Sequence, residues 1–235
     1  LALPANLETS NYLKKFGVNN VQVAGNLKFY GKQNIENKIS ISIKKKFKNF
    51  KVWCASSTHE REEELIFKIH KKLKKNQKKL ITIIIPRHIN RISEIVNKVK
   101  TNNLNYVIHS SKKKIMKNTD IYLVDAYGLT SSFFHLSNIT FVGGSVIKHG
   151  GQNPLEPARQ GNYVISGPNI WNFVEIYEFL AKNNISTVTS DLSKIEKIIN
   201  FKLNKKISKY SKSKINNIGV DILNKNLLQI RKYLP

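Results

Sequence analysis

The residues best suited to chemistry lie in one segment, 141–157, with the sequence FVGGSVIKHGGQNPLEP, which holds four of the chain's 11 glycines. Glycine lets the backbone approach a ligand closely. Asn153 and Pro154 favour the N-cap and the first position of a helix. Backbone N–H groups and the positive end of the dipole at such a helix start favour a phosphate or a ribose hydroxyl. Glu156 either complements that dipole or accepts hydrogen bonds from a ribose diol.

Two further groups follow apolar runs. Pro86, Arg87 and His88 come directly after the run 80–85, and Arg is a natural bidentate partner of phosphate or carboxylate. The segment 125–129, Asp-Ala-Tyr-Gly-Leu, follows the run 121–124, and its Gly128 lets the backbone approach a base or a phosphate. In open α/β sheets, ligands collect at the carboxyl ends of the strands. Both groups are therefore candidate ligand contacts.

A fourth group surrounds His59. Ser57 and Glu60 have the spacing of a capping box, which predicts that a helix begins there. His59 and Glu63 are four residues apart but do not form the H-E-x-x-H pattern, so we predict no metal site. The chain also has neither a Walker lysine motif nor a G-x-G-x-x-G fingerprint, which excludes the common phosphate-loop families.

The elements that would position these residues are short apolar runs separated by stretches of helical periodicity. Continuous rather than alternating apolar runs are typical of buried parallel strands. The pattern predicts an α/β domain with a Rossmann-like parallel sheet and helices on both faces. The predicted strands are 51–56, 80–85, 106–109, 121–124, 139–142, 163–166 and 187–189, with helices around residues 65–73, 92–99 and 174–180.

Three segments are expected along the chain. Residues 1–48 end a preceding domain with a short strand at 21–24 and a Lys-rich connector, and residues 49–202 form the α/β domain that carries the candidate ligand contacts. Residues 203–235 carry apolar residues at the spacing of a basic amphipathic helix, which either packs on its own domain or lies on anionic lipid. The chain begins with Leu1 and has no signal-peptide pattern, so we expect it to start inside a longer polypeptide.

The composition narrows the function classes. The 235 residues include 40 Lys and Arg against 15 Asp and Glu, a net charge of +25. Basic surfaces bind phosphates, nucleic acid or anionic membranes. However, these lysines occur together with many Asn and Ile residues, a combination that a strong nucleotide bias in the coding sequence also produces. They are scattered over the predicted helices, which argues against nucleic-acid binding. One cysteine, Cys54, excludes an intrachain disulfide, and no apolar stretch approaches the ~18 residues of a membrane span.

Six motifs occur in a fixed order: G-N-L-K-F at 25–29, S-T-H-E at 57–60, P-R-H at 86–88, F-V-G-G-S at 141–145, H-G-G-x-N-P-L-E-P at 149–157 and G-P-x-x-x-N-F at 167–173. Together they resemble the 3-deoxy-D-manno-octulosonic acid (Kdo) transferases. The resemblance extends over about residues 6–200, and the H-G-G-x-N-P-L-E-P stretch is its most specific part.

This resemblance implies a two-domain GT-B glycosyltransferase, of which the chain would be the C-terminal half. The family transfers Kdo from CMP-Kdo to a hydroxyl of a lipid A precursor in lipopolysaccharide core biosynthesis, inverting the anomeric centre without a metal or another cofactor. By the resemblance, Lys28 would be catalytic and stabilise charge on the transferring sugar or its phosphate. The CMP site would be lined by Pro86, Arg87, Tyr127, Gly128, Leu129, Asn153, Pro154, Leu155 and Glu156.

The family's general base is a glutamate of the N-terminal domain, which also carries most of the acceptor and membrane-binding surface. We therefore expect this chain alone to bind nucleotide weakly and to transfer nothing. The full-length protein would act on an anionic membrane surface, at the cytoplasmic face of the bacterial inner membrane, with its anchor in the N-terminal part. We expect no nucleic-acid partner.

Three positions depart from the family pattern. Leu129 stands where an acidic residue is usual, so only backbone contacts carry over there, and Lys148 and Gln152 replace a frequent Pro and a frequent His. Three alternatives remain open: a GT-B enzyme that uses a UDP-sugar, a truncated nucleotide-binding fragment without catalysis, and, more distantly, a basic nucleic-acid-binding protein. Selectivity for CMP over UDP and over RNA distinguishes them.

Overall fold

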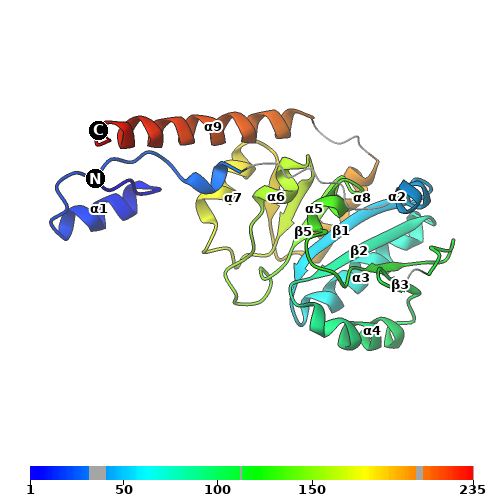
Figure 1. Cartoon of the computed structure of the whole chain (residues 1–235). Helices are drawn as coiled ribbons and strands as arrows, with labels where there is room; N and C mark the ends of the chain where they lie inside the picture. Colours follow the sequence, from blue (N-terminus) through cyan, green and yellow to red (C-terminus); the bar gives the residue numbers. More distant parts are fainter. Residues whose placement is uncertain (32–40, 112, 205–208, 235) are drawn as a thin grey trace. The chain divides into compact units, whose positions relative to one another are not determined.

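The computed structural model describes residues 1–31, 41–111, 113–204 and 209–234. It divides into two compact units, unit 1 with Leu1–Asn34 and Lys209–Pro235, and unit 2 with Ile35–Ser208 (Figure 1). This division differs from the three segments expected at 1–48, 49–202 and 203–235, because the two ends of the chain fold together.

Unit 2 is built on a seven-stranded sheet in the order β3-β4-β2-β1-β5-β6-β7. Every neighbouring pair is parallel, as the continuous apolar runs predicted. Each of the seven predicted runs overlaps one strand; the runs 139–142 and 163–166 have the same bounds as their strands, and the others differ at one or both ends by one or two residues. The strands are β1 (Lys51–Thr58), β2 (Leu80–Pro86), β3 (Tyr106–Ile108), β4 (Ile121–Leu123), β5 (Ile139–Val142), β6 (Tyr163–Ser166) and β7 (Ser186–Val188).

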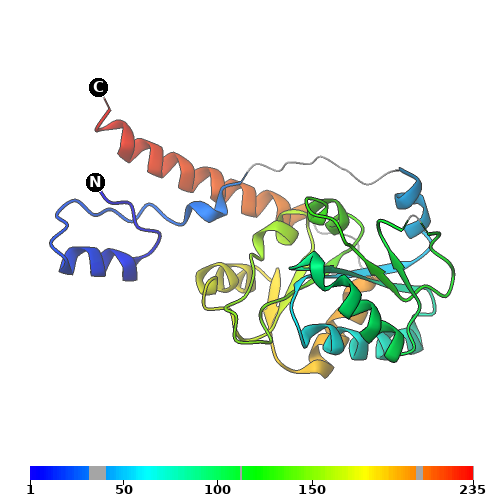
Figure 2. The same cartoon turned by 60° about the horizontal axis from the view of Figure 1, so that its bottom comes forward.

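Helices cover both faces of the sheet, which confirms the predicted fold class. On β1, Trp53 and Ala55 pack with α3 (Glu62–Asn76), α4 (Ile92–Thr101) and α8 (Leu192–Leu203). Val52 and Cys54 point to the other face, toward α2 (Ile41–Phe47) and α5 (Thr130–Phe134). Both sets of side chains are buried, which is why the runs are continuously apolar. Figures 1 and 2 show α3 and α4 next to each other on one side of the sheet.

The central strands position the site. The chain leaves β1 toward β2 on one side and returns on the other side as β5, which pairs with β1. This reversal of strand order is a topological switch point, where ligands bind at the carboxyl ends of the strands. The segments that follow β1 and β5 meet at that point. They contain His59 and the glycines that begin at Gly143.

Unit 1 consists of α1 (Leu7–Lys15), the short 3-10 turn η1 (Leu27–Phe29) and α9 (Lys209–Arg231). Helix α9 packs directly on η1: a Cβ at Gly219 would lie 2.3 Å from the Phe29 carbonyl oxygen, and one at Gly25 would lie 3.0 Å from Ile222. The predicted amphipathic helix at 203–234 is thus divided between the end of α8 and α9, and residues 205–208 lie outside the described part.

Two predictions for the N-terminal segment need correction. The strand at 21–24 does not form, and only an isolated bridge joins Val21 to Ala2. Of the predicted connector, residues 32–40 lie outside the described residues, and Ile41–Phe47 form α2. Among the described residues, none of the helices combines the length and apolar character needed to span a bilayer.

Candidate functional site

The segment after β1 starts its helix later than the capping box predicts. Ser57 is still in β1 and has a φ of 53°, and α3 begins only at Glu62. Ser57 and Glu60 therefore do not form a capping box. Instead, the Thr58 hydroxyl donates to Glu63 (2.9 Å). The guanidinium of Arg91 donates two further hydrogen bonds to the Glu63 carboxylate, at 2.9 and 3.2 Å.

The buried Glu62 carboxylate binds the backbone of the glycine-rich loop that begins at Gly143. Its side chain is fully buried and accepts hydrogen bonds from the backbone N–H groups of His59 (3.0 Å), Gly144 (2.8 Å), Ser145 (3.0 Å) and Val146 (3.0 Å). A Cβ at Gly143 would lie 2.4 Å from the Ser57 carbonyl oxygen and 2.7 Å from Glu62 Oε2. The expectation that these glycines allow close approach of a ligand is therefore wrong for Gly143. The close approach there is to the protein's own Ser57 and Glu62.

The second glycine pair is held by the segment that follows β6. Gly150 and Gly151 have φ values of 92° and 79°, and a Cβ at Gly150 would overlap Trp171 and Asn172. The backbone N–H of Asn172 donates to the Gly150 carbonyl (3.1 Å), and Gly167 N–H donates to the Ser145 hydroxyl (2.9 Å). The G-P-x-x-x-N-F motif therefore supports the H-G-G loop.

Three histidines meet above this loop. The ring centroids of His59 and His149 are 4.4 Å apart, and those of His59 and His88 are 6.1 Å apart. His59 is 9% exposed, whereas His88 and His149 are exposed. Burial lowers the pKa of His59, the neighbouring imidazoles lower it further, and Glu62 and the Ser57 carbonyl oppose this shift.

Pro86 and Arg87 lie where they were predicted, at the carboxyl end of β2. Pro86 is buried and ends the strand, while Arg87 is exposed. The Arg87 backbone N–H donates to the Thr58 carbonyl (3.0 Å), which ties the end of β2 to the end of β1. Of the two, only Arg87 presents a side chain to a ligand.

Residues 127–129 follow β4 at the same edge of the sheet. Asp125 fixes this loop by accepting hydrogen bonds from the backbone N–H (3.0 Å) and the hydroxyl of Ser110. Gly128 has a φ of 76°, Tyr127 is 68% exposed, and Leu129 packs against the core on the α5 face. Tyr127 and the backbone of this turn therefore remain as possible ligand contacts.

Residues 153–156 start α6 (Leu155–Arg159). The Asn153 side chain accepts from the Leu155 N–H (3.0 Å), but the helix begins at Leu155 with Pro154 as its N-cap, one residue later than predicted. Pro154 and Leu155 are buried, so they can offer only backbone groups, whereas Asn153 and Glu156 are exposed. Desolvation raises the pKa of the Glu156 carboxyl, and the charge of Arg159 opposes this. The helix has five residues, so its dipole contributes less than the sequence suggested.

The predicted CMP residues thus lie at the end of β2 and in the segments that follow β2, β4 and β5, all within unit 2. A hydrogen bond from Gln160 to Ser131 (3.1 Å) joins the end of α6 to α5. Lys28 lies in η1, in unit 1, so its role rests on the resemblance alone. Within the described residues, no group of three or more His, Cys, Asp or Glu side chains is arranged to hold a metal. Sequence reasoning missed the role of Glu62, because three of its four hydrogen-bond partners are more than 80 residues away.

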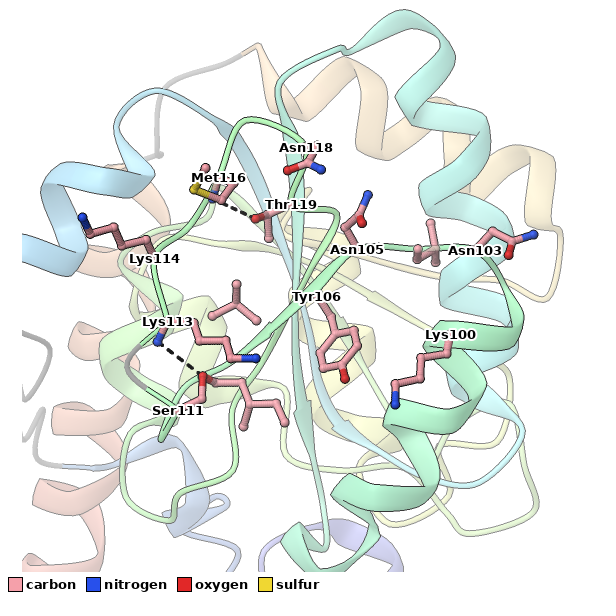
Figure 3. Close-up of a pocket in the computed structure, with 13 residues that line it drawn as sticks. Lys100, Asn103, Asn105, Tyr106, Ser111, Lys113, Lys114, Met116, Asn118 and Thr119 are labelled. Carbon is pink, nitrogen blue, oxygen red and sulfur yellow. Dashed lines mark hydrogen bonds between the residues drawn. The ribbon is translucent and has the colours of Figure 1, made fainter.

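A separate groove of about 670 Å³ lies along β3, at the edge of the sheet. Its lining includes Lys100, Lys113 and Lys114 but none of the predicted CMP residues. Figure 3 shows Lys100 and Lys113 on either side of the Tyr106 ring. This basic groove is the feature of unit 2 that best fits the distant alternative of a basic nucleic-acid-binding protein.

Comparisons with known proteins extend the resemblance. No family model matches the chain. It is 33% identical over 184 residues to 3-deoxy-D-manno-octulosonic acid transferase of Haemophilus influenzae, covering 78% of this chain and 42% of the relative. It is 30% identical over 240 residues to the protein of the same name from Rickettsia prowazekii, covering 97% and 52%. The chain spans about half the length of these curated relatives.

Solved structures agree with the sequence matches. The C-terminal CMP-Kdo binding domain of WaaA from Acinetobacter baumannii is similar with a TM-score of 0.63 and 26% identity, over 76% of this chain and 90% of that one. An α,α-trehalose 6-phosphate synthase from Burkholderia multivorans shares only the fold, with a TM-score of 0.52 and 12% identity over 82% and 44%. The fold is therefore the C-terminal half of a GT-B glycosyltransferase, and by sequence and by fold the chain is a homologue of the Kdo transferases, as its motifs predicted.

Proposed function

We propose that this chain is the donor-binding part of a Kdo transferase and that it binds the CMP portion of CMP-Kdo at the carboxyl edge of its sheet. The observation that carries the proposal is the convergence of Arg87, the 127–129 turn and the start of α6 on that edge, beside the switch point. The similarity to a solved CMP-Kdo binding domain supports the same ligand.

Each group has a chemical task. The Arg87 guanidinium is suited to a phosphate, and the Glu156 carboxylate is suited to the hydroxyls of the ribose. Gly128, with its φ of 76°, holds a turn whose backbone can approach the base. As CMP departs, negative charge develops on its phosphate, so preorganised cations and N–H groups near it lower the barrier. Lys28 would serve the same purpose for the transferring sugar or its phosphate.

The complete reaction extends beyond these residues. We propose transfer to a hydroxyl of a lipid A precursor with inversion and without a metal, using a general-base glutamate of the family's N-terminal domain. The full-length protein would work on the anionic cytoplasmic face of the bacterial inner membrane. The chain alone is expected to bind nucleotide and to transfer nothing.

The test is a calorimetric titration of the chain with CMP, UDP and a short single-stranded RNA at one moderate salt concentration. Selective binding of CMP is expected. Preference for UDP would support a GT-B enzyme that uses a UDP-sugar. Tight RNA binding without nucleotide binding would instead support the alternative of a basic nucleic-acid-binding protein. Binding of none of the three would contradict the proposal.

A further inference from the structure

We propose that His59, His88 and His149 form an anion subsite that holds the phosphate of the cytidine nucleotide. The inference rests on the proposed function, because it assigns the part of the donor that these side chains contact. Each histidine follows a different strand, β1, β2 or β5, and these strands are neighbours at the centre of the sheet. The three rings therefore meet at the switch point.

The orientation of His59 leaves one ring nitrogen for a ligand. Its Nδ1 lies 3.0 Å from the Ser57 carbonyl oxygen, which can only accept, so Nδ1 carries the proton. Its Nε2 is buried and has no hydrogen-bond partner among the described residues. Buried polar atoms are nearly always paired. An unpaired nitrogen at the ligand edge of a sheet therefore indicates a partner that arrives with the ligand.

The surroundings of His59 are shaped to keep the rings together. Gly144 lies against two of them, since a Cβ there would come within 3.2 Å of both His59 and His149. Glu62 holds the backbone of Gly144 from below through a 2.8 Å hydrogen bond. His88 directly follows Arg87, so a phosphate near His88 also lies within reach of a permanent cation.

The charge balance favours uptake of a proton together with an anion. Burial lowers the pKa of His59, and His149 and His88 lower it further, while Glu62 and the Ser57 carbonyl raise it. The imidazole is therefore neutral at neutral pH while the site is empty. A bound phosphate adds negative charge beside the ring and raises its pKa. Protonated Nε2 then donates to the phosphate, so binding consumes a proton.

The experiment is calorimetric titration of the chain with CMP and with cytidine at pH 7.5, in buffers that differ in ionisation enthalpy. A cationic site lowers the pKa of the CMP phosphate itself and releases protons, so net uptake must come from the protein. We expect uptake with CMP but not with cytidine. His59→Gln and His149→Gln should each weaken CMP binding about tenfold, reduce the uptake and leave cytidine binding unchanged.

Lys148→Gln is the matched control, because it removes an exposed positive charge from the same loop without removing an imidazole. It should leave proton uptake unchanged. The exposed His149 keeps the test valid if the buried His59 variant folds poorly. Wild-type CMP affinity and uptake in His149→Gln would overturn the subsite while the proposed function stands. Equal losses for CMP and cytidine would also overturn it, by assigning the histidines to the nucleoside. If the wild-type chain binds neither ligand, the proposed function and the subsite fail together.

Discussion

A buried histidine lies beside a carboxylate at each end of the parallel strands, one at their amino ends (the amino edge) and one at their carboxyl ends (the carboxyl edge). The two clusters serve different purposes. At the amino edge, His70 Nδ1 bonds to the Thr82 hydroxyl (2.7 Å) and Nε2 contacts Asp120 (3.4 Å). Lys74 completes this cluster with a 2.9 Å contact to Asp120. At the carboxyl edge, His59 has a partner for Nδ1 and none among the described residues for Nε2.

Both clusters join a buried histidine to a buried carboxylate, so neither residue type nor burial distinguishes structure from function. What distinguishes the two clusters is whether every buried polar atom has a hydrogen-bond partner. A cluster with every polar atom paired stabilises the fold, whereas an unpaired buried nitrogen is costly unless a ligand completes it. The amino-edge cluster ties α3 to the starts of β2 and β4. The carboxyl-edge cluster places its unpaired atom where nucleotides bind in such sheets.

The largest expected effect is that of Glu62→Ala. Losing this carboxylate leaves four backbone N–H groups without their acceptor, so we expect a loss on the order of 4 kcal/mol in the free energy of unfolding. CMP binding should also weaken, because the glycine-rich loop that carries His149 loses its hydrogen bonds to Glu62. Urea unfolding measures the first effect. Glu60→Ala is the control and should change stability by less than about 0.5 kcal/mol, since no capping box forms; equal losses would contradict the role of Glu62.

Asp120→Ala tests the amino-edge cluster. Burial raises the pKa of Asp120, but hydrogen bonds from His70, Asn105 and Lys74 hold it well below its usual range. Removing this acceptor should lower the free energy of unfolding by about 3 kcal/mol. The affinity of the folded variant for CMP should stay that of the wild type. A clear fall in CMP affinity, measured where the variant is fully folded, would erase the distinction between the two edges.

Arg87→Ala and Glu156→Ala test the nucleotide contacts. Each should weaken CMP binding about tenfold or more, on the ~1.5–3 kcal/mol of a hydrogen bond to a charged group. Stability should change little, because both side chains are exposed. Arg231→Ala and Glu178→Ala remove equivalent exposed charges elsewhere and should bind CMP normally. Wild-type affinity in both site variants would remove these residues from the CMP site.

A smaller effect concerns pH. Burial lowers the pKa of both His70 and His59 below the value near 6.5 that they have when unfolded. In the window from the folded pKa up to about 6.5 the unfolded state binds more protons, so stability falls as pH decreases, by at most about 1.4 kcal/mol per pH unit for each histidine. Saturating CMP should remove the contribution of His59 to this pH dependence of stability and leave the contribution of His70. Unfolding curves between pH 5 and 7 with and without CMP measure this; identical slopes would contradict the comparison.

The sequence predicted the sheet because strands buried on both faces are continuously apolar, as Trp53 and Cys54 on opposite faces of β1 illustrate. The motifs predicted that Arg87 follows β2 and that Glu156 lies in the first turn of α6. The sequence placed Leu155 in the site, although the side chain belongs to the core. It did not predict the role of Glu62, since three of the four N–H groups that the carboxylate binds are 82 to 84 residues away and only the pairing of β1 with β5 brings them together.

The central claim is that the carboxyl edge of the sheet binds the cytidine nucleotide. Amide chemical-shift mapping of the labelled chain during a CMP titration tests it most directly. Saturable shifts are expected at residues 59, 87, 88, 127–129, 149–153, 155 and 156, with the residues that line the groove along β3 unchanged. Shifts concentrated in that groove, or none that saturate, would contradict the account.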